Sequence, residues 1–242
     1  MAWQPWHRSP EQSQLLERIV TLANEVGPGH TAVFDLDGCL FDTRPRQVYI
    51  LREYASRTGC WDFYRVQIEH FEDWHLHNTL RNAGLDAALI DAHRESLGSF
   101  WWERFFDGAY HAHDLPMPGA VGLVRAVHEA GLHCVYLTGR HTPTRAGTEG
   151  ALRRHGFPFG DERSHLVVKG ALEDDDTRFK ANALEALDQR GSIVLFLDNE
   201  PGNVNLFADR HPGALVVWLM TDHSPRPLAA YENLPRLFGF LA

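Results

Sequence analysis

The chain has 242 residues, 44% of them hydrophobic and 23% charged, which is enough for a globular α/β core with an inserted segment. The formal net charge of −9 argues against a broad nucleic-acid-binding face, because such faces are basic. No stretch reaches the roughly 20 apolar residues of a membrane span, and the three scattered cysteines fit neither a disulfide framework nor a zinc motif. We therefore expect a cytoplasmic protein without nucleic-acid or membrane partners, and the sequence leaves its oligomeric state open.

Apolar runs and helical patterns alternate along most of the chain. A helical stripe covers residues 11–26, and a buried-strand run follows from Thr31 to Asp35. The further strands expected are His133–Thr138, His165–Lys169, Ser192–Asp198 and Ala214–Met220, and the helices between them are Ala120–Ala130, Arg145–His155, Arg178–Gln189 and Gly202–Arg210. Because the strand runs are almost continuously apolar, both faces of the sheet should be covered by helices. The alternation predicts an α/β fold with a doubly wound parallel sheet.

One long segment interrupts this alternation. Between the first and second expected strands, residues 44–118 are rich in helical patterns and aromatic side chains. About 75 residues are too many for a simple crossover between neighbouring strands. We therefore predict an inserted helical cap at 44–118, between core segments 1–43 and 119–242. The aromatic run 101–106 is interpreted mainly as the interior of the cap, with part of it facing the active site.

Two aspartates close the first expected strand. Asp35 and Asp37 are two residues apart, so their side chains point to the same side of an extended chain. The carboxyl ends of strands in doubly wound sheets open onto the ligand crevice, and Gly38 allows a sharp turn there. Two neighbouring carboxylates repel each other unless a cation or a shared proton intervenes. A hard divalent cation such as magnesium would meet this need.

Polar residues also close two other expected strands. Thr138 and Gly139 end the second strand and offer a hydroxyl and main-chain N–H groups, which are donors that suit phosphate oxygens. Asp198 ends the fourth strand and adds a third carboxylate, and Asn199, Glu200 and Asn203 follow it with roles that the sequence leaves open.

A lysine near this crevice would offset its negative charge, and the chain offers two. Lys169 closes the third expected strand, and Lys180 opens the helix that leads to Asp198. We prefer Lys180, because one helix and one strand separate it from Asp198.

Together these motifs resemble the haloacid dehalogenase superfamily, whose phosphatases form an aspartyl-phosphate. The run 116–139 is similar to the same family. The resemblance implies a Rossmann-like core, a magnesium cofactor and one role for each matching residue: Asp35 as nucleophile, Asp37 as general acid and base, Thr138 as phosphoryl ligand, Lys180 as neutralising cation and Asp198 as metal ligand. It also implies that magnesium lies between Asp35, Asp198 and the main-chain carbonyl of Asp37.

The function expected from these residues is magnesium-dependent hydrolysis of a phosphomonoester of a small metabolite. A phosphomutase of the same fold remains an alternative, because it would use the same Asp35 and Asp37 pair. A non-catalytic protein that binds phosphorylated ligands is a second alternative. Phosphonate cleavage is disfavoured, since residues 44–118 contain no lysine for a Schiff base. The sequence does not name the substrate.

Overall fold

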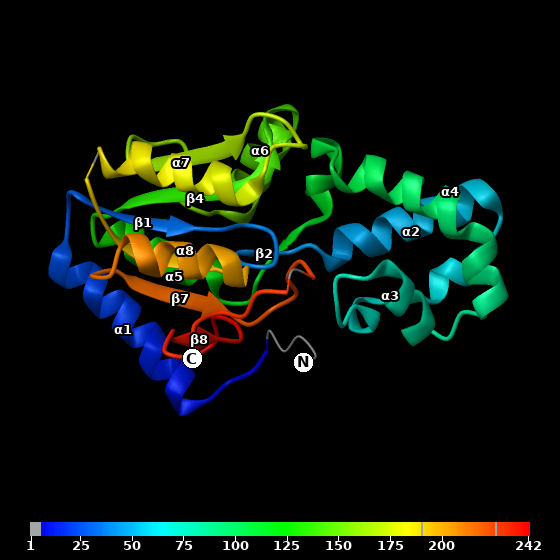
Figure 1. The fold of residues 1–242 in the computed structure, drawn as a ribbon, viewed down its shortest axis with the longest axis horizontal. Helices are drawn as coiled ribbons and strands as arrows, with labels where there is room; N and C mark the ends of the chain where they lie inside the picture. Colours follow the sequence, from blue (N-terminus) through cyan, green and yellow to red (C-terminus); the bar gives the residue numbers. More distant parts are fainter. Residues whose placement is uncertain (1–5, 190, 226) are drawn as a thin grey trace.

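The core of the protein is a parallel sheet of six strands in the order β5-β4-β1-β6-β7-β8; Figure 1 labels β4, β1, β7 and β8 of this sheet. A computed structural model describes residues 6–189, 191–225 and 227–242, so the first five residues of the expected core segment 1–43 lie outside it. The strands are β1 His30–Phe34, β4 His133–His141, β5 Ser164–Lys169, β6 Ser192–Asp198, β7 Leu215–Leu219 and β8 Arg236–Leu237. Because β1 lies between β4 and β6, the chain reverses direction across the sheet beside β1, as in doubly wound folds.

Helices cover both faces of this sheet. They are α1 Pro10–Val26, α5 Ala120–Glu129, α6 Arg145–His155, α7 Asp176–Asp188 and α8 Pro201–Arg210. Buried residues of α1, α5 and α6 share one apolar cluster with Ala32 and Phe34 of β1, whereas α7 and α8 share another with Val33. Successive side chains of a strand point to opposite faces, so β1 contributes to both clusters. The α/β fold predicted from the sequence is confirmed.

The segment between β1 and β4 forms a helical lobe, defined here as residues 44–113, beside the sheet (Figure 1). It contains α2 Arg44–Thr58, α3 Leu76–Asn82 and α4 Ala87–Phe105, with 3₁₀ turns at Trp61–Arg65, Ile68–His70 and Gly108–His113. The lobe has an apolar cluster of its own, which includes Leu51, Tyr54 and Phe63. No strand occurs among its residues, all of which the structure describes. The division of the chain into domains at 43/44 and 118/119 stays a prediction.

The two ends of the lobe meet in a short ribbon. Strand β2 (Phe41–Asp42) pairs antiparallel with β3 (Leu115–Pro116). The sequence does not predict this ribbon, since two-residue strands carry no periodic pattern. The ribbon fixes where the lobe begins and returns, close to the carboxyl end of β1.

Strand β4 differs from its expected form at the end that faces the lobe. It continues past Thr138 to His141, and its pairing with β5 is irregular between these two residues. Gly139 and Arg140 therefore lie in a bulge of the strand and not in the turn that the sequence suggests. Bulges change the direction of side chains near active sites. In the part of the chain that the structure describes, no helix has both the length and the apolar character needed to cross a membrane.

Candidate active site

The candidate site begins at the carboxyl end of β1, where the chain turns sharply after Asp37. Gly38 has a φ of +73°, and a Cβ there would collide with the side-chain amide of Asn199. Only glycine combines this backbone conformation with so close a contact. The main-chain N–H of Asp35 donates to the carbonyl of Leu197 in β6 at 2.9 Å. The turn therefore holds Asp35 beside the end of β6.

A buried lysine connects the ends of β1 and β6. Lys180, in α7, donates from Nζ to Asp35 Oδ1 and to Asp198 Oδ2, both at 2.6 Å. Asp198 also accepts from the main-chain N–H of Glu200 at 2.9 Å and from the amide of Asn203 at 3.1 and 3.2 Å. The three charged side chains are at most 8% exposed. One ammonium thus balances two buried carboxylates, which leaves an excess of negative charge.

Burial has the largest effect on the ionisation of this cluster. Burial raises the pKa of Asp35, Asp198 raises it further, and Lys180 only partly offsets them. Burial alone would lower the pKa of Lys180, but the two carboxylates outweigh it and raise that pKa above its usual range. Lys180 is therefore charged, while the ionised form of Asp35 needs a further positive partner.

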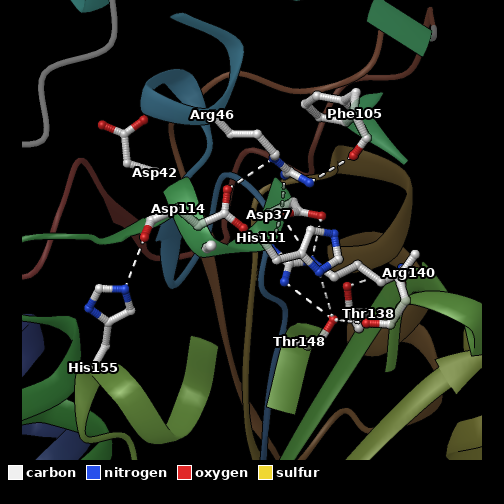
Figure 2. A network of polar contacts seen from close by, with 12 residues as sticks. Asp37, Asp42, Arg46, Phe105, His111, Asp114, Thr138, Arg140, Thr148 and His155 are labelled. Atoms are coloured by element: carbon white, nitrogen blue, oxygen red, sulfur yellow. Dashed lines mark hydrogen bonds and ion pairs between the residues drawn. The ribbon is translucent and has the colours of Figure 1, made fainter. Parts of the chain in front are cut away.

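Asp37 belongs to a second network, which Figure 2 shows. Arg140 donates to both oxygens of Asp37, and Arg46 of α2 donates to Asp37 Oδ1 at 3.1 Å. Asp114, at the return of the lobe, lies between the same two arginines, 2.6 Å from Arg140 Nη2 and 3.0 Å from Arg46 Nε. Two carboxylates and two guanidinium groups thus form a charge-balanced network that joins the sheet to the helical lobe.

The arginines hold Asp37 in its ionised form. Partial burial would raise the pKa of Asp37, but Arg140 and Arg46 outweigh it and keep the pKa well below its usual range. Asp114 is fully buried, and burial raises its pKa to about 6 despite the same arginines. Burial, Arg140 and Arg46 lower the pKa of His111, so this imidazole is neutral. In this conformation Asp37 accepts hydrogen bonds and has no proton to donate.

A cavity of about 250 Å³ connects the two networks. Asp35, Asp37, Thr138, Gly139 and Lys180 line its sheet side, and aromatic residues of the helical lobe line the other side. Asn199, Glu200 and Asn203 also border it, as does Lys169.

The two candidate lysines differ in their partners. Lys180 contacts Asp35 and Asp198, whereas Lys169 Nζ donates to Asp176 at 2.9 Å and to two main-chain carbonyls. Of the residues that the sequence singles out for phosphate chemistry, all but Asp198 thus line one cavity, and Asp198 contacts Lys180, which lines it.

Sequence reasoning misses Arg46 and Asp114, because their partners are far away along the chain. Asp37 and Arg140 are 103 residues apart, and no periodic pattern marks such pairs. One signal was available, since Arg46 and Asp114 both stand at the borders of the predicted cap, where core and insertion must meet. Charged residues there are candidates for contacts between the two parts.

Comparisons with known proteins agree with this geometry. A family model of haloacid dehalogenase-like hydrolases matches residues 30–213. The chain therefore belongs to the haloacid dehalogenase-like hydrolases. A search of curated proteins finds no match.

Two solved structures illustrate the shared fold. A Clostridium difficile protein described as a phosphatase has a TM-score of 0.52 and 11% identity, over 85% of this chain and 89% of that one. Protein tyrosine kinase A of Mycobacterium tuberculosis has a TM-score of 0.50 and 20% identity, over 87% of this chain and 93% of that one. At such identities the likeness shows the fold alone.

Proposed function

We propose that this hydrolase cleaves phosphomonoesters of small metabolites, with magnesium as cofactor and the carboxylate of Asp35 as nucleophile. The observation that carries the proposal is the position of Asp35. Its carboxylate lies 2.6 Å from the ammonium of Lys180 and borders the cavity that Thr138 and Gly139 also line. Phosphoryl transfer depends mainly on positioning and on stabilising charge, and this arrangement offers both. The family of hydrolases to which the chain belongs supports the same class of reaction.

The residues at the cavity fit a magnesium ion. The cluster of Asp35, Asp198 and Lys180 carries more negative than positive charge. The amide oxygen of Asn199 is buried and has no hydrogen-bond partner among the described residues, although Asn199 borders the cavity. Hard oxygen donors of this kind suit magnesium.

The proposed ligands are Asp35, Asp198 and the main-chain carbonyl of Asp37, with Asn199 as a further oxygen donor. No group of three His, Cys, Asp or Glu side chains suited to a metal occurs in the described part of the chain, so this set depends on main-chain and amide oxygens as well. Bound there, the ion would reduce the repulsion between Asp35 and an anionic substrate.

The first step would be an in-line attack by Asp35. A bond forms between a carboxylate oxygen and phosphorus while the bond from phosphorus to the leaving oxygen breaks, which gives an aspartyl-phosphate. The hydroxyl of Thr138, the main-chain N–H of Gly139 and the ammonium of Lys180 would donate to the phosphoryl oxygens. Water would then attack phosphorus as the bond from phosphorus to the Asp35 oxygen breaks, which releases free phosphate and restores the carboxylate.

Asp37 would act as the acid and base of this reaction. As an ionised carboxylate it is ready to take a proton from the attacking water. To protonate a leaving group it must first take up a proton, which requires the loss of at least one contact to Arg46 or Arg140. Alkyl leaving groups need this proton, whereas phenolate leaves without it. The network therefore favours leaving groups that are stable as anions.

The decisive experiment compares three proteins. Asp35→Asn should abolish magnesium-dependent phosphate release from p-nitrophenyl phosphate and leave the circular dichroism spectrum unchanged. Asp91→Asn is a matched control, because this carboxylate is 66% exposed on the helical lobe. Chelation should remove wild-type activity and magnesium should restore it. Full activity of Asp35→Asn, or activity that persists after chelation, would refute the proposal.

The same assay separates the alternative functions. A phosphomutase would move phosphate between two positions of a sugar without releasing it, so the products must be analysed as well as free phosphate. A binding protein without turnover would retain affinity for phosphate esters and release no phosphate with any member of a metabolite panel.

A further inference from the structure

The lobe side of the cavity is lined by four aromatic side chains, named here the aromatic wall: Trp74, Trp102, Phe105 and Phe106. Trp74 precedes α3, Trp102 and Phe105 lie in the last turn of α4, and Phe106 follows that helix. Trp102 is 54% exposed and Trp74 is 42% exposed. Large apolar surface left open to solvent beside reactive groups is typical of a ligand-binding site.

The aromatic wall is built as a connected set of rings. Trp102 lies against Phe106 with ring centroids 4.5 Å apart, and Phe105 meets Phe106 edge to face at 5.1 Å. Trp74 meets Phe105 edge to face at 6.3 Å. Such contacts hold rings in defined orientations. The four rings therefore form one connected surface on the lobe side of the cavity.

Arg46 attaches the aromatic wall to the catalytic groups. Its guanidinium lies 4.2 Å from the ring centroid of Phe105 and donates to the carbonyl of Phe105 at 2.9 Å, and the same group donates to Asp37 (Figure 2). A cation placed over an aromatic ring is attracted to the face of that ring. The wall is thus held at a set distance from the carboxylates at the floor of the cavity.

The cavity has two ends of different chemistry. Its floor is ionic, with Asp35 and Lys180, and its wall is aromatic. At about 250 Å³ it is smaller than most pockets for drug-sized ligands, which measure roughly 300–1,000 Å³. A phosphate with one ring system attached fits this size and this division of chemistry.

We propose that the substrate is a small phosphomonoester whose leaving group carries a planar aromatic ring, and that Trp102 and Trp74 select for this ring. The inference rests on the proposed function for the reaction itself, but the recognition of the ring can be tested without turnover. Exposure alone does not mark the site, since Trp61 of the same lobe is 61% exposed and does not border this cavity; the inference depends on the position of Trp102 and Trp74 at the cavity.

Trp61 therefore provides a matched control. The test measures binding of two phosphonates that cannot be hydrolysed, phenylphosphonate and cyclohexylphosphonate, to the full-length protein with magnesium by calorimetry. Both carry the same charged group and a six-membered ring, but only one ring is planar and aromatic. We expect phenylphosphonate to bind about three- to ten-fold more tightly, the range that ring contacts give beyond burial of area.

The variants assign this preference to the wall. Trp102→Ala and Trp74→Ala should each reduce the preference for phenylphosphonate, and the double variant should abolish it. Trp102→Phe should keep most of the preference, because it retains an aromatic ring. Trp61→Ala should leave the preference unchanged. Equal binding of the two phosphonates by the wild-type protein, or an unchanged preference in the double variant, would overturn the inference. Ring-selective binding without any phosphatase activity would support the inference and refute the proposed function.

Turnover assays with two phosphate esters then distinguish two sources of the aromatic ring. Phenyl phosphate carries the ring directly on the ester oxygen, whereas a nucleoside monophosphate carries it on a sugar. A wall-dependent KM for either one supports the inference, and the lower KM identifies the source. If replacement of Trp102 changes the KM of neither ester, the wall does not select the substrate.

Discussion

Removal of the Asp114 carboxylate should destabilise the protein strongly. Asp114 is fully buried, and the two arginines that it contacts, Arg46 and Arg140, are only 1% and 3% exposed. In Asp114→Ala both guanidinium groups must share Asp37, so the buried network carries an excess positive charge. Breaking a buried ion pair by removal of one partner costs about 3–5 kcal/mol. A total stability of about 5–15 kcal/mol is usual for a protein domain, so this loss is large.

Two further variants identify the cause of the loss. Glu149→Ala removes a carboxylate from surface pairs with Arg145 and Arg153, which are 44% and 55% exposed, and exposed pairs contribute about 0–1 kcal/mol. The combination of Asp114→Leu with Arg46→Met removes one charge of each sign. Because it restores the balance of charge, we expect this double variant to be more stable than Asp114→Ala.

Urea unfolding followed by circular dichroism measures these differences, and thermal scans give an independent value. At about 2–4 °C per kcal/mol for a chain of this size, Asp114→Ala should lower the Tm by about 6–20 °C. Equal stability of Asp114→Ala and Glu149→Ala would refute the argument. A double variant that is less stable than Asp114→Ala would show that lost packing, and not unbalanced charge, determines the cost.

Three more predictions follow, two from the site and one from Asp222, whose main-chain carbonyl accepts from the amide of Asn199 at 2.6 Å. Lys180→Met should lower kcat by about 10²–10³-fold, the usual effect of removing one donor to the reacting group. Lys169→Met should lower kcat much less. Equal losses of kcat for the two variants in steady-state kinetics would contradict this prediction. Asp37→Asn should slow formation of the intermediate far more with alkyl phosphates than with p-nitrophenyl phosphate, and single-turnover rates that fall equally would exclude an acid role. Asp222→Asn should stabilise the protein more at pH 8 than at pH 5 in urea titrations. Burial, with nearby carboxylates, raises the pKa of Asp222 in the folded state to about 7. Below this pH the folded state binds more protons than the unfolded state, so the stability of the wild-type protein falls as pH rises toward 7. An equal gain in stability of Asp222→Asn at pH 5 and at pH 8 would contradict this prediction.

Much of the core could be predicted from local patterns. Helix α6 and strand β6 have the expected bounds, and the other expected core elements agree to within about two residues apart from β4, the usual uncertainty of element ends. These elements are long, and each buries a continuous apolar face, which leaves a clear periodic signal. The three strand ends that carry Asp35, Thr138 and Asp198 could be placed together because parallel strands end at the same edge of a sheet.

The rest of the site depends on contacts that no local pattern encodes. Arg46 contacts Phe105, 59 residues away in the chain, and neither residue differs locally from an ordinary helical residue. The sequence predicts the aromatic run 101–106 mainly inside the lobe, with part of it facing the site, but it does not say which residues do so. Phe105 is indeed 4% exposed, but Trp102 is 54% exposed, because the helix ends there and turns one side toward the cavity. Strand β8 and the ribbon of β2 and β3 have two residues each, too few for any period.

The ribbon of β2 and β3 has a consequence for the order of folding. Strands β1 and β4 are neighbours in the sheet, yet the whole helical lobe separates them in the chain. Once the lobe has formed around its own apolar cluster and its ends are joined at Phe41 and Pro116, the effective loop between the two strands is about four times shorter. Each halving of a loop reduces the entropic cost of closure by about 0.6 kcal/mol, so a folded lobe favours this pairing by roughly 1 kcal/mol. The lobe whose aromatic residues border the cavity thus also favours the pairing of β1 with β4.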